Sequence, residues 1–288
     1  AWPRGPAVPC LVGLAAYTAD LANHSHLVIR SLLGPSPRSG SRFYGLGNEL
    51  EITLALLFLI GLAAVLRRRE RTRAGALAFA LGGAVLALVM GSGRLGADVG
   101  GIFTVAGGTA VATLLMLPGG VTRRALAVAL LTPVAGLAAL AVVDLVTSGD
   151  GHFTRTVLEG SVSDQLDTFR RRYELAWNIL TGGFAPLLLV LCGLAIAYAV
   201  RHRDRIYGAL AADPVWRACL LGGLGASVAG MLFNDSGPVL LFIGVVALAC
   251  LTSYLRADPG RPADGAGTSP PAGGNATAPP APARATAA

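Results

Sequence analysis

The sequence predicts an all-α fold, a polytopic bundle of transmembrane helices, on three observations. Hydrophobic residues make up 53% of the 288 residues, and the mean hydropathy is +0.62. Only 14% of the residues are charged, whereas soluble domains carry about 25%. The apolar residues fall in runs that reach the ~20 residues a helix needs to cross a bilayer. This composition excludes an ordinary soluble globule, a disordered chain and a disulfide-rich scaffold.

Seven apolar segments are typical of spanning helices, and we expect residues 1–256 to form one transmembrane domain. The segments lie at 49–66, 74–91, 99–118, 125–147, 178–200, 215–233 and 238–255. The N-terminal run at 5–22 would make an eighth span, although an apolar stretch after Arg4 is equally typical of a signal-peptide core. Residues 257–288 are mostly Pro, Ala, Gly and Thr, so that this tail cannot bury a core and is predicted to be disordered.

Arginine is the only basic residue type apart from histidine, and its placement orients the predicted bundle. The formal net charge is +7, which in a soluble protein would suggest nucleic acid as a partner. Here arginines gather at 67–73, 123–124, 201–205 and 256, after the first, third, fifth and seventh clear spans. Basic loops stay in the cytoplasm. We therefore expect a lipid bilayer rather than nucleic acid as the partner, and a cytoplasmic C-terminus.

The other connections carry the unusual polar residues, and the topology predicts that they share the outer face. They are 42–49, 91–101, 148–177 and 233–238. In the long segment 148–177, apolar residues recur at intervals of four, three and four, at Val162, Leu166, Phe169 and Tyr173. This spacing predicts an amphipathic helix lying in the outer interface. Four polar or glycine-rich outer ends could converge on one extracytoplasmic site.

Each polar cluster has a structural interpretation beside the functional one. Glu49 and Glu51 lie near a predicted helix start, where carboxylates gain about 0.3–1 kcal/mol from the helix dipole. Asp98 could act only as a helix N-cap, and Ser236 or Asp235 could cap the last span. In the functional interpretation, glycine-rich turns let the backbone approach a ligand, and free N–H groups at helix starts bind anions.

No sequence motif identifies a metal or a cofactor. The sequence contains no GxxxxGK[ST] loop, no HExxH and no GxSxG, so known ATP-driven and zinc-protease chemistries are unsupported. The four cysteines lie in apolar runs without metal-ligand spacing and are interpreted as small buried hydrophobes.

Three stretches resemble the motifs of a bacterial family of multi-pass membrane proteins without an established activity. They are Phe-Tyr-Gly-Leu-Gly-Asn-Glu at 43–49, Gly-Ala-Asp-Val-Gly-Gly at 96–101 and Asn-Asp-Ser-Gly at 234–237, and the resemblance covers about residues 30–255. The family patterns are FYG[IL]GNE, NDSG and Ser-His-x-Gly-Arg; His152 and Arg155 match the last pattern, whereas Gly151 and Thr154 depart from it. The resemblance implies that Glu49 matters more than Glu51, and that the chain is the C-terminal part of a longer bacterial protein.

Two hypotheses on function follow, and a non-catalytic membrane scaffold remains as a third. The first is an enzyme at the outer face of the cell membrane, acting on an anionic or lipid-linked cell-envelope precursor, with arginines on its phosphate. The second is a transporter or flippase, in which Gly107-Gly108 and Pro133 interrupt spans. We rank the enzyme first because the polar residues concentrate at one end. Its predicted catalytic residues are Glu49, Asp98, His152 and Asp235, and its predicted substrate-binding residues are Arg42, Tyr44, Asn48, Arg94, Arg155, Asn234 and Ser236.

Overall fold

The computed structural model is all-helical over the residues that it describes, which confirms the predicted fold class for them. These residues are 4–34, 45–67, 70–127, 131–132, 134, 136–138, 142, 167, 170, 174, 177–178, 180–210, 212–234 and 236–257. All of them belong to one compact unit, Ala1–Asp258.

Five helices are long and apolar enough to cross a membrane, as expected of a multi-pass integral membrane protein. They are α2 (Asn48–Leu66), α3 (Arg73–Gly91), α4 (Val99–Met116), α10 (Pro214–Phe233) and α11 (Gly237–Arg256). Each coincides with a span predicted from an apolar run. The agreement follows from length, because 18 to 20 apolar residues have few stable arrangements other than a helix inside a bilayer.

The remaining predicted spans are only partly represented in the described residues. α1 (Ala7–Ala22) and α8 (Ala185–Arg201) are apolar but shorter, at 16 and 17 residues. α8 leads into the short α9 (Arg203–Tyr207) and the 3-10 turn η4 (Gly208–Leu210), and a second 3-10 turn, η2 (Val28–Arg30), follows α1. Most of the predicted span at 125–147 lies outside the described residues. So do most of the predicted interfacial helix within 148–177 and nearly all of the predicted tail.

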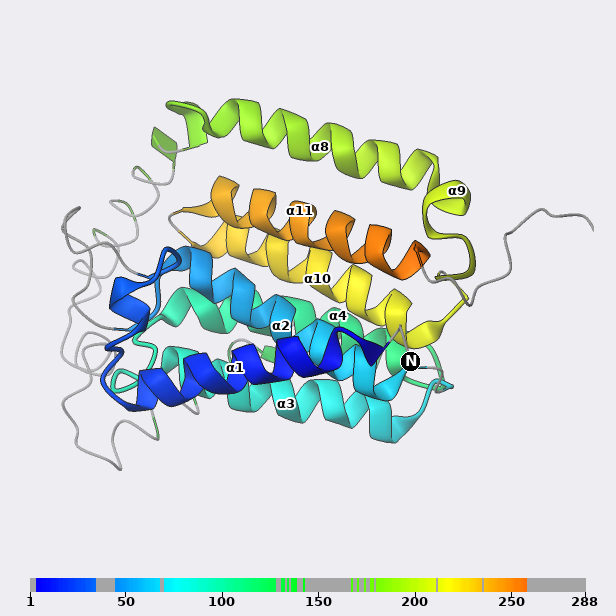
Figure 1. The fold of residues 1–288 in the computed structure, drawn as a ribbon, viewed down its shortest axis with the longest axis horizontal. Helices are drawn as coiled ribbons and strands as arrows, with labels where there is room; N and C mark the ends of the chain where they lie inside the picture. Colours follow the sequence, from blue (N-terminus) through cyan, green and yellow to red (C-terminus); the bar gives the residue numbers. More distant parts are fainter. Residues whose placement is uncertain are drawn as a thin grey trace, which may run out of the picture. The chain divides into compact units, whose positions relative to one another are not determined.

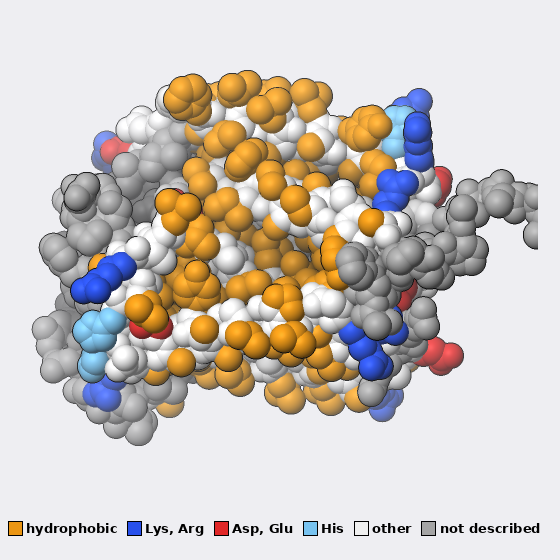
Figure 2. Space-filling view, in the orientation of Figure 1, with side chains coloured by type: hydrophobic (Ala, Val, Ile, Leu, Met, Phe, Trp, Pro, Cys, Tyr) orange, Lys and Arg blue, Asp and Glu red, His pale blue; other side chains and the backbone are white. Residues whose placement is uncertain are grey.

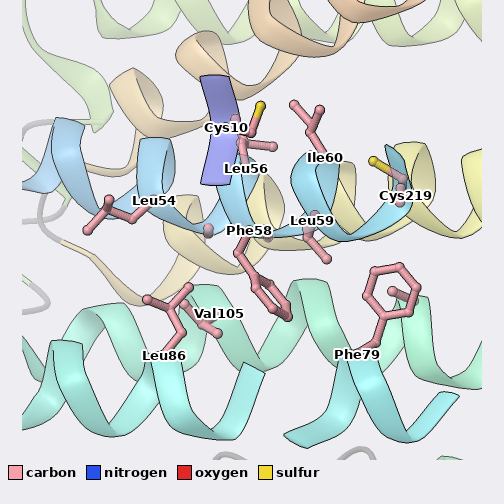
Figure 3. Packing of buried hydrophobic residues seen from close by; sticks show 14 of the residues in the cluster. Cys10, Leu54, Leu56, Phe58, Leu59, Ile60, Phe79, Leu86, Val105 and Cys219 are labelled. Carbon is pink, nitrogen blue, oxygen red and sulfur yellow. The ribbon is translucent and has the colours of Figure 1, made fainter. Parts of the chain in front are cut away.

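α2 is the central helix of this unit. It packs against α1, α3, α4, α10 and α11, and it lies among these helices in Figure 1. Most of its residues are apolar and buried. This pattern is expected of a helix buried within a bundle. Figure 3 shows how the contact with α3 is filled: Phe58 reaches from α2, and its ring meets that of Phe79 edge to face, with centroids 6.5 Å apart. The outer members of the bundle are α1, which packs on α2, and α8, which packs on α11.

α4 and α10 approach each other most closely, along a seam of small residues. A Cβ added at Gly107 would lie 2.5 Å from the Cβ of Ala229, and one added at Gly222 would lie 2.9 Å from the carbonyl oxygen of Gly108. Such small-residue contacts let two backbones approach within a membrane. α4 runs as one uninterrupted helix through Gly107 and Gly108, so these glycines serve packing and do not break the span.

Charged side chains gather at the two ends of the unit, and an apolar belt separates them (Figure 2). We call one end the basic end. It holds the connections after α2, α4 and α8 and the end of α11, with Arg67, Arg71, Arg73, Arg123, Arg124, Arg201, Arg203, Arg205, Arg217 and Arg256. We call the other the polar end, where α2, α4 and α11 begin and α3 and α10 end (Figure 1). The belt includes exposed side chains such as Leu81 and Leu194, as expected of a surface that faces lipid.

Candidate functional site

Glu51 is the most deeply buried charged side chain at the polar end. It has 0% relative exposure and lies one turn into α2, about 4.5 Å below Asn48 at the helical rise of ~1.5 Å per residue. The hydroxyl of Thr104, on α4, donates to its Oε1. The amide Nδ2 of Asn234, at the end of α10, donates to its Oε2 at 2.5 Å. Three helices therefore meet at one carboxyl group.

The carboxyl group of Asp98 lies beside that of Glu51. Asp98 is 3% exposed, and its Oδ1 also accepts from the backbone N–H of Gly100 at 3.1 Å, so it caps α4 as well. Two buried carboxyl groups therefore lie side by side at this point of the site, and we call Glu51 and Asp98 the acidic pair.

The starts of α2, α4 and α11 place partial positive charge around this pair. Helix N-termini expose backbone N–H groups and favour nearby negative charge. Asp98 is the N-cap of α4, and Gly47 and Ser236 are the N-caps of α2 and α11. This arrangement lowers the free-energy cost of burying carboxyl groups at that depth.

A second layer of hydrogen bonds links three helices above Glu51. Asn48 Nδ2 donates to Ser236 Oγ at 2.7 Å, and the backbone N–H of Ser236 donates to Asn234 Oδ1 at 3.1 Å. Because Asn234 accepts from Ser236 with its oxygen, its amide nitrogen is turned toward Glu51. The Asn-Asp-Ser-Gly stretch therefore orients the donor that Glu51 uses.

Two glycines in the first turn of α4 make room for this arrangement. A Cβ added at Gly100 would lie 3.0 Å from Asn234 Nδ2, and one added at Gly101 would lie 3.4 Å from Glu51 Cγ. A side chain at Gly100 would crowd the amide of Asn234, and one at Gly101 would crowd Met90 of α3, whose Sδ would lie 3.2 Å from the added Cβ. The sequence predicted that this glycine-rich stretch lets the backbone approach a ligand. In the structure it lets the backbone of α4 approach Glu51 and Asn234.

The loop before α4 fixes the position of Asp98 through backbone hydrogen bonds. The N–H of Asp98 donates to the carbonyl of Met90 at 2.9 Å, so the loop folds back on the end of α3. The N–H of Leu46 donates to the carbonyl of Gly96 at 2.8 Å, which ties this loop to the start of α2. Ala97 has φ +52°, a conformation that a non-glycine residue rarely adopts.

The structure brings together four of the residues predicted from sequence: Asn48, Asp98, Asn234 and Ser236. Glu49 and Arg94 lie elsewhere at the polar end, where Glu49 is half-buried in the first turn of α2 and Arg94 is exposed in the loop. The predicted site residues Arg42, Tyr44, His152, Arg155 and Asp235, together with Asp144 in the fourth predicted span, lie outside the described residues.

Sequence reasoning did not place Glu51 or Thr104 in the site. A helical-face argument could have found Glu51, because it is three residues after Asn48 and shares its side of α2. The same argument relates Thr104 to Gly100 and Gly101, which lie four and three residues before it. The motif resemblance gave priority to Glu49 instead.

No group of three or more His, Cys, Asp or Glu side chains that could hold a metal ion occurs in the described part of the chain. Within that part, the acidic pair and Thr104 bring three oxygen-bearing side chains together. No assignment of a metal or cofactor follows from them.

Comparison of the chain with models of protein families, with curated protein sequences and with solved structures found no match. The resemblance to the bacterial membrane family therefore stays a prediction that rests on its three motifs. The functional argument depends on the geometry of the acidic pair.

Proposed function

We propose that this chain is an integral membrane enzyme of the bacterial cell membrane, with the acidic pair as its proton-transfer centre. The observation that carries the proposal is the burial of Glu51 beside Asp98 within a spanning helix. Inserting an ionisable side chain at mid-depth of the membrane costs about 2.5–3.5 kcal/mol on insertion scales. Such side chains in spanning segments usually mark function. The substrate is a lipid-linked or phosphorylated envelope precursor at the outer face.

The acidic pair supplies a base and an acid in one place. Its ionised carboxylate accepts the proton of a hydroxyl group or water as the oxygen of that group forms a bond to the phosphorus or carbonyl carbon of the substrate. Its protonated carboxyl donates a proton to the leaving oxygen as the bond between that oxygen and the same centre breaks. Thr104 and Asn234 hold Glu51 in position, and Asn48 and Ser236 bind the substrate above it. The other roles in this proposal are phosphate binding by Arg42, Arg94 and Arg155, and further proton transfer or metal binding by Glu49, His152 and Asp235.

The proposed topology has seven spans, with α1 as an eighth, and places the basic end in the cytoplasm. The support is the excess of arginines at the basic end among the described residues, compared with Arg30, Arg94 and Arg170 in the predicted outer connections. This orientation puts the end of α11 in the cytoplasm and the acidic pair near the outer leaflet.

An enzyme fits the described core better than a transporter does. Transport needs polar groups at several depths of the membrane. The buried hydroxyls of Thr109, Ser227 and Thr252 each donate at 2.7 Å to a carbonyl four residues earlier in the same helix. They are satisfied locally. The seam between α4 and α10 is closed by glycines and alanines. The polar groups that join different helices lie mainly at the polar end.

The test follows conversion of envelope lipids by the purified protein in nanodiscs. Lipid extracts from a bacterial envelope are incubated with wild type, Glu51→Gln and Asp98→Asn, and the products are identified by mass spectrometry. We expect wild type to convert one lipid class and both variants to lose conversion at least a hundredfold. Gln and Asn keep the size of the side chains and the hydrogen bonds to Thr104 and Gly100, but the new amide of Glu51→Gln no longer accepts from Asn234. Thermal unfolding of both variants is therefore measured beside conversion, so that a loss of activity is separated from a loss of folding.

Glu70→Gln is the matched control, because Glu70 is an exposed carboxylate at the basic end. It should convert lipid as wild type does. Equal conversion by Glu51→Gln and wild type would exclude the acidic pair from catalysis. Transbilayer movement of a labelled lipid without any chemical change would identify a flippase instead.

A further inference from the structure

Two phenylalanines lie next in the chain to residues that bond to Glu51, and one of them is exposed on the surface of the bundle. Phe103 on α4 directly precedes Thr104, and Phe233 at the end of α10 directly precedes Asn234. Their rings stack with centroids 4.7 Å apart and planes 18° apart, and Phe233 is 58% exposed. Each ring thus neighbours, along the chain, a side chain that donates to Glu51.

The phenylalanine pair, Phe103 and Phe233, lies where the contact between α4 and α10 nears the polar end. One turn deeper Gly107 faces Ala229, and backbones and small side chains fill the interface. At the phenylalanine pair, two large stacked rings take part in the interface as well. Rings can change rotamer without moving a helix, whereas a glycine seam can open only if the helices separate. The interface is therefore easiest to open at the phenylalanine pair.

The surroundings of Glu51 define which chemical group can reach it. In the described part of the chain, the side chains that contact its carboxyl are those of Asp98, Thr104 and Asn234, which are acidic or neutral. A phosphate group placed against Glu51 would meet like charge in a medium of low dielectric constant. A hydroxyl or ammonium group can donate a hydrogen bond to Glu51 in place of Thr104 or Asn234.

We propose that the acidic pair receives an amphiphile from the outer leaflet through the interface between α4 and α10. Its hydroxyl or amino head group contacts Glu51, and its apolar chain packs on Phe103 and Phe233 while remaining in the bilayer. This inference rests on the proposed function and names its substrate class. Any phosphate that the amphiphile carries lies farther from Glu51 than this group.

Photo-crosslinking from Phe233 tests the route. Phe233 is replaced by 4-benzoylphenylalanine, the protein is irradiated in its native membranes, and the attached lipids are identified by mass spectrometry. The control carries the same residue at Leu81, which is 64% exposed in the middle of α3 and reports the bulk lipid. We expect position 233 to be enriched at least fivefold over position 81 in one lipid with a hydroxyl or amino head group. Adding Glu51→Gln should remove most of that enrichment.

The same lipid composition at both positions would overturn the inference, because the phenylalanine pair would then only face bulk lipid. The result is separable from the proposed function. Enrichment without conversion of any lipid would support the route and refute the enzyme. Conversion of a lipid by wild type without enrichment at position 233 would support the enzyme and refute the route.

Discussion

The polar end and the apolar middle of the bundle satisfy their buried polar groups in opposite ways. At the polar end, Glu51 bonds to Thr104 and Asn234, which come from two other helices. In the middle, hydroxyls such as those of Thr109 and Ser227 bond within their own helices. Bonds within one helix leave the neighbours free to vary, whereas bonds between helices fix which residues must meet. The difference indicates that the polar end determines which helices pair, whereas the apolar middle contributes packing only.

The largest effect is expected from Gly108→Leu, which disrupts the packing of α4 against α10 in the apolar middle. An added Cβ would lie 2.8 Å from the Cβ of Ala226 and 3.0 Å from the carbonyl oxygen of Gly222, so α4 and α10 must separate. Overpacking a core typically costs about 1–3 kcal/mol of stability. We expect a larger cost here because the backbones of α4 and α10 must move apart. We expect loss of the folded protein in detergent, measured by thermal unfolding. Gly193→Leu on α8 is the control, since nothing lies within 4 Å of a Cβ there, and it should unfold as wild type does.

Thr104→Val should have the next largest effect, because it removes a hydrogen bond between α4 and α2 at the polar end. It leaves Glu51 Oε1 without the hydroxyl that donates to it, at a cost of about 1–3 kcal/mol for a buried unsatisfied group. Thermal unfolding and lipid conversion should both fall. Thr104→Ser restores the donor and should recover most of both quantities. Wild-type behaviour of Thr104→Val would show that the bond between α2 and α4 has no importance.

Gly100→Ala is expected to have a smaller effect that is concentrated on activity. The new Cβ would lie 3.0 Å from Asn234 Nδ2, so the amide must shift by a few tenths of an ångström away from Glu51. We expect a loss of about 1 kcal/mol in stability and a severalfold loss of conversion. Gly93→Ala in the preceding loop meets no atom within 4 Å and should leave conversion unchanged.

The smallest effect is expected from a substitution in the apolar middle. Thr109→Val removes a buried hydroxyl whose bond goes to the carbonyl of Val105 in its own helix, and that carbonyl keeps its helical bond. We expect a change within about 0.5 kcal/mol in unfolding and unchanged lipid conversion. A loss as large as that of Thr104→Val would mean that burial alone, and not the bond between helices, decides the cost.

Long apolar runs allowed five spanning helices to be placed from the sequence, because a bilayer leaves such runs few alternatives. The positions of Asn48, Asp98, Asn234 and Ser236 at helix ends also followed from polar residues next to those runs. Glu51 and Thr104 did not follow, because their meeting depends on how α2 and α4 rotate against each other. A threonine in an apolar helix normally bonds to its own backbone, as Thr109 does, so the pattern around Thr104 carried no signal.

The order in which the chain is made bears on the hydrogen bonds of Glu51. Thr104 follows Glu51 by 53 residues, whereas Asn234 follows it by 183. During synthesis, α2 and α4 are therefore in the membrane long before the end of α10 emerges from the ribosome. Until then the Glu51 carboxyl lacks its amide donor, and the glycine face of α4 lacks α10, the helix that packs on it. The first half of the protein is thus an intermediate in assembly that the arrival of α10 completes.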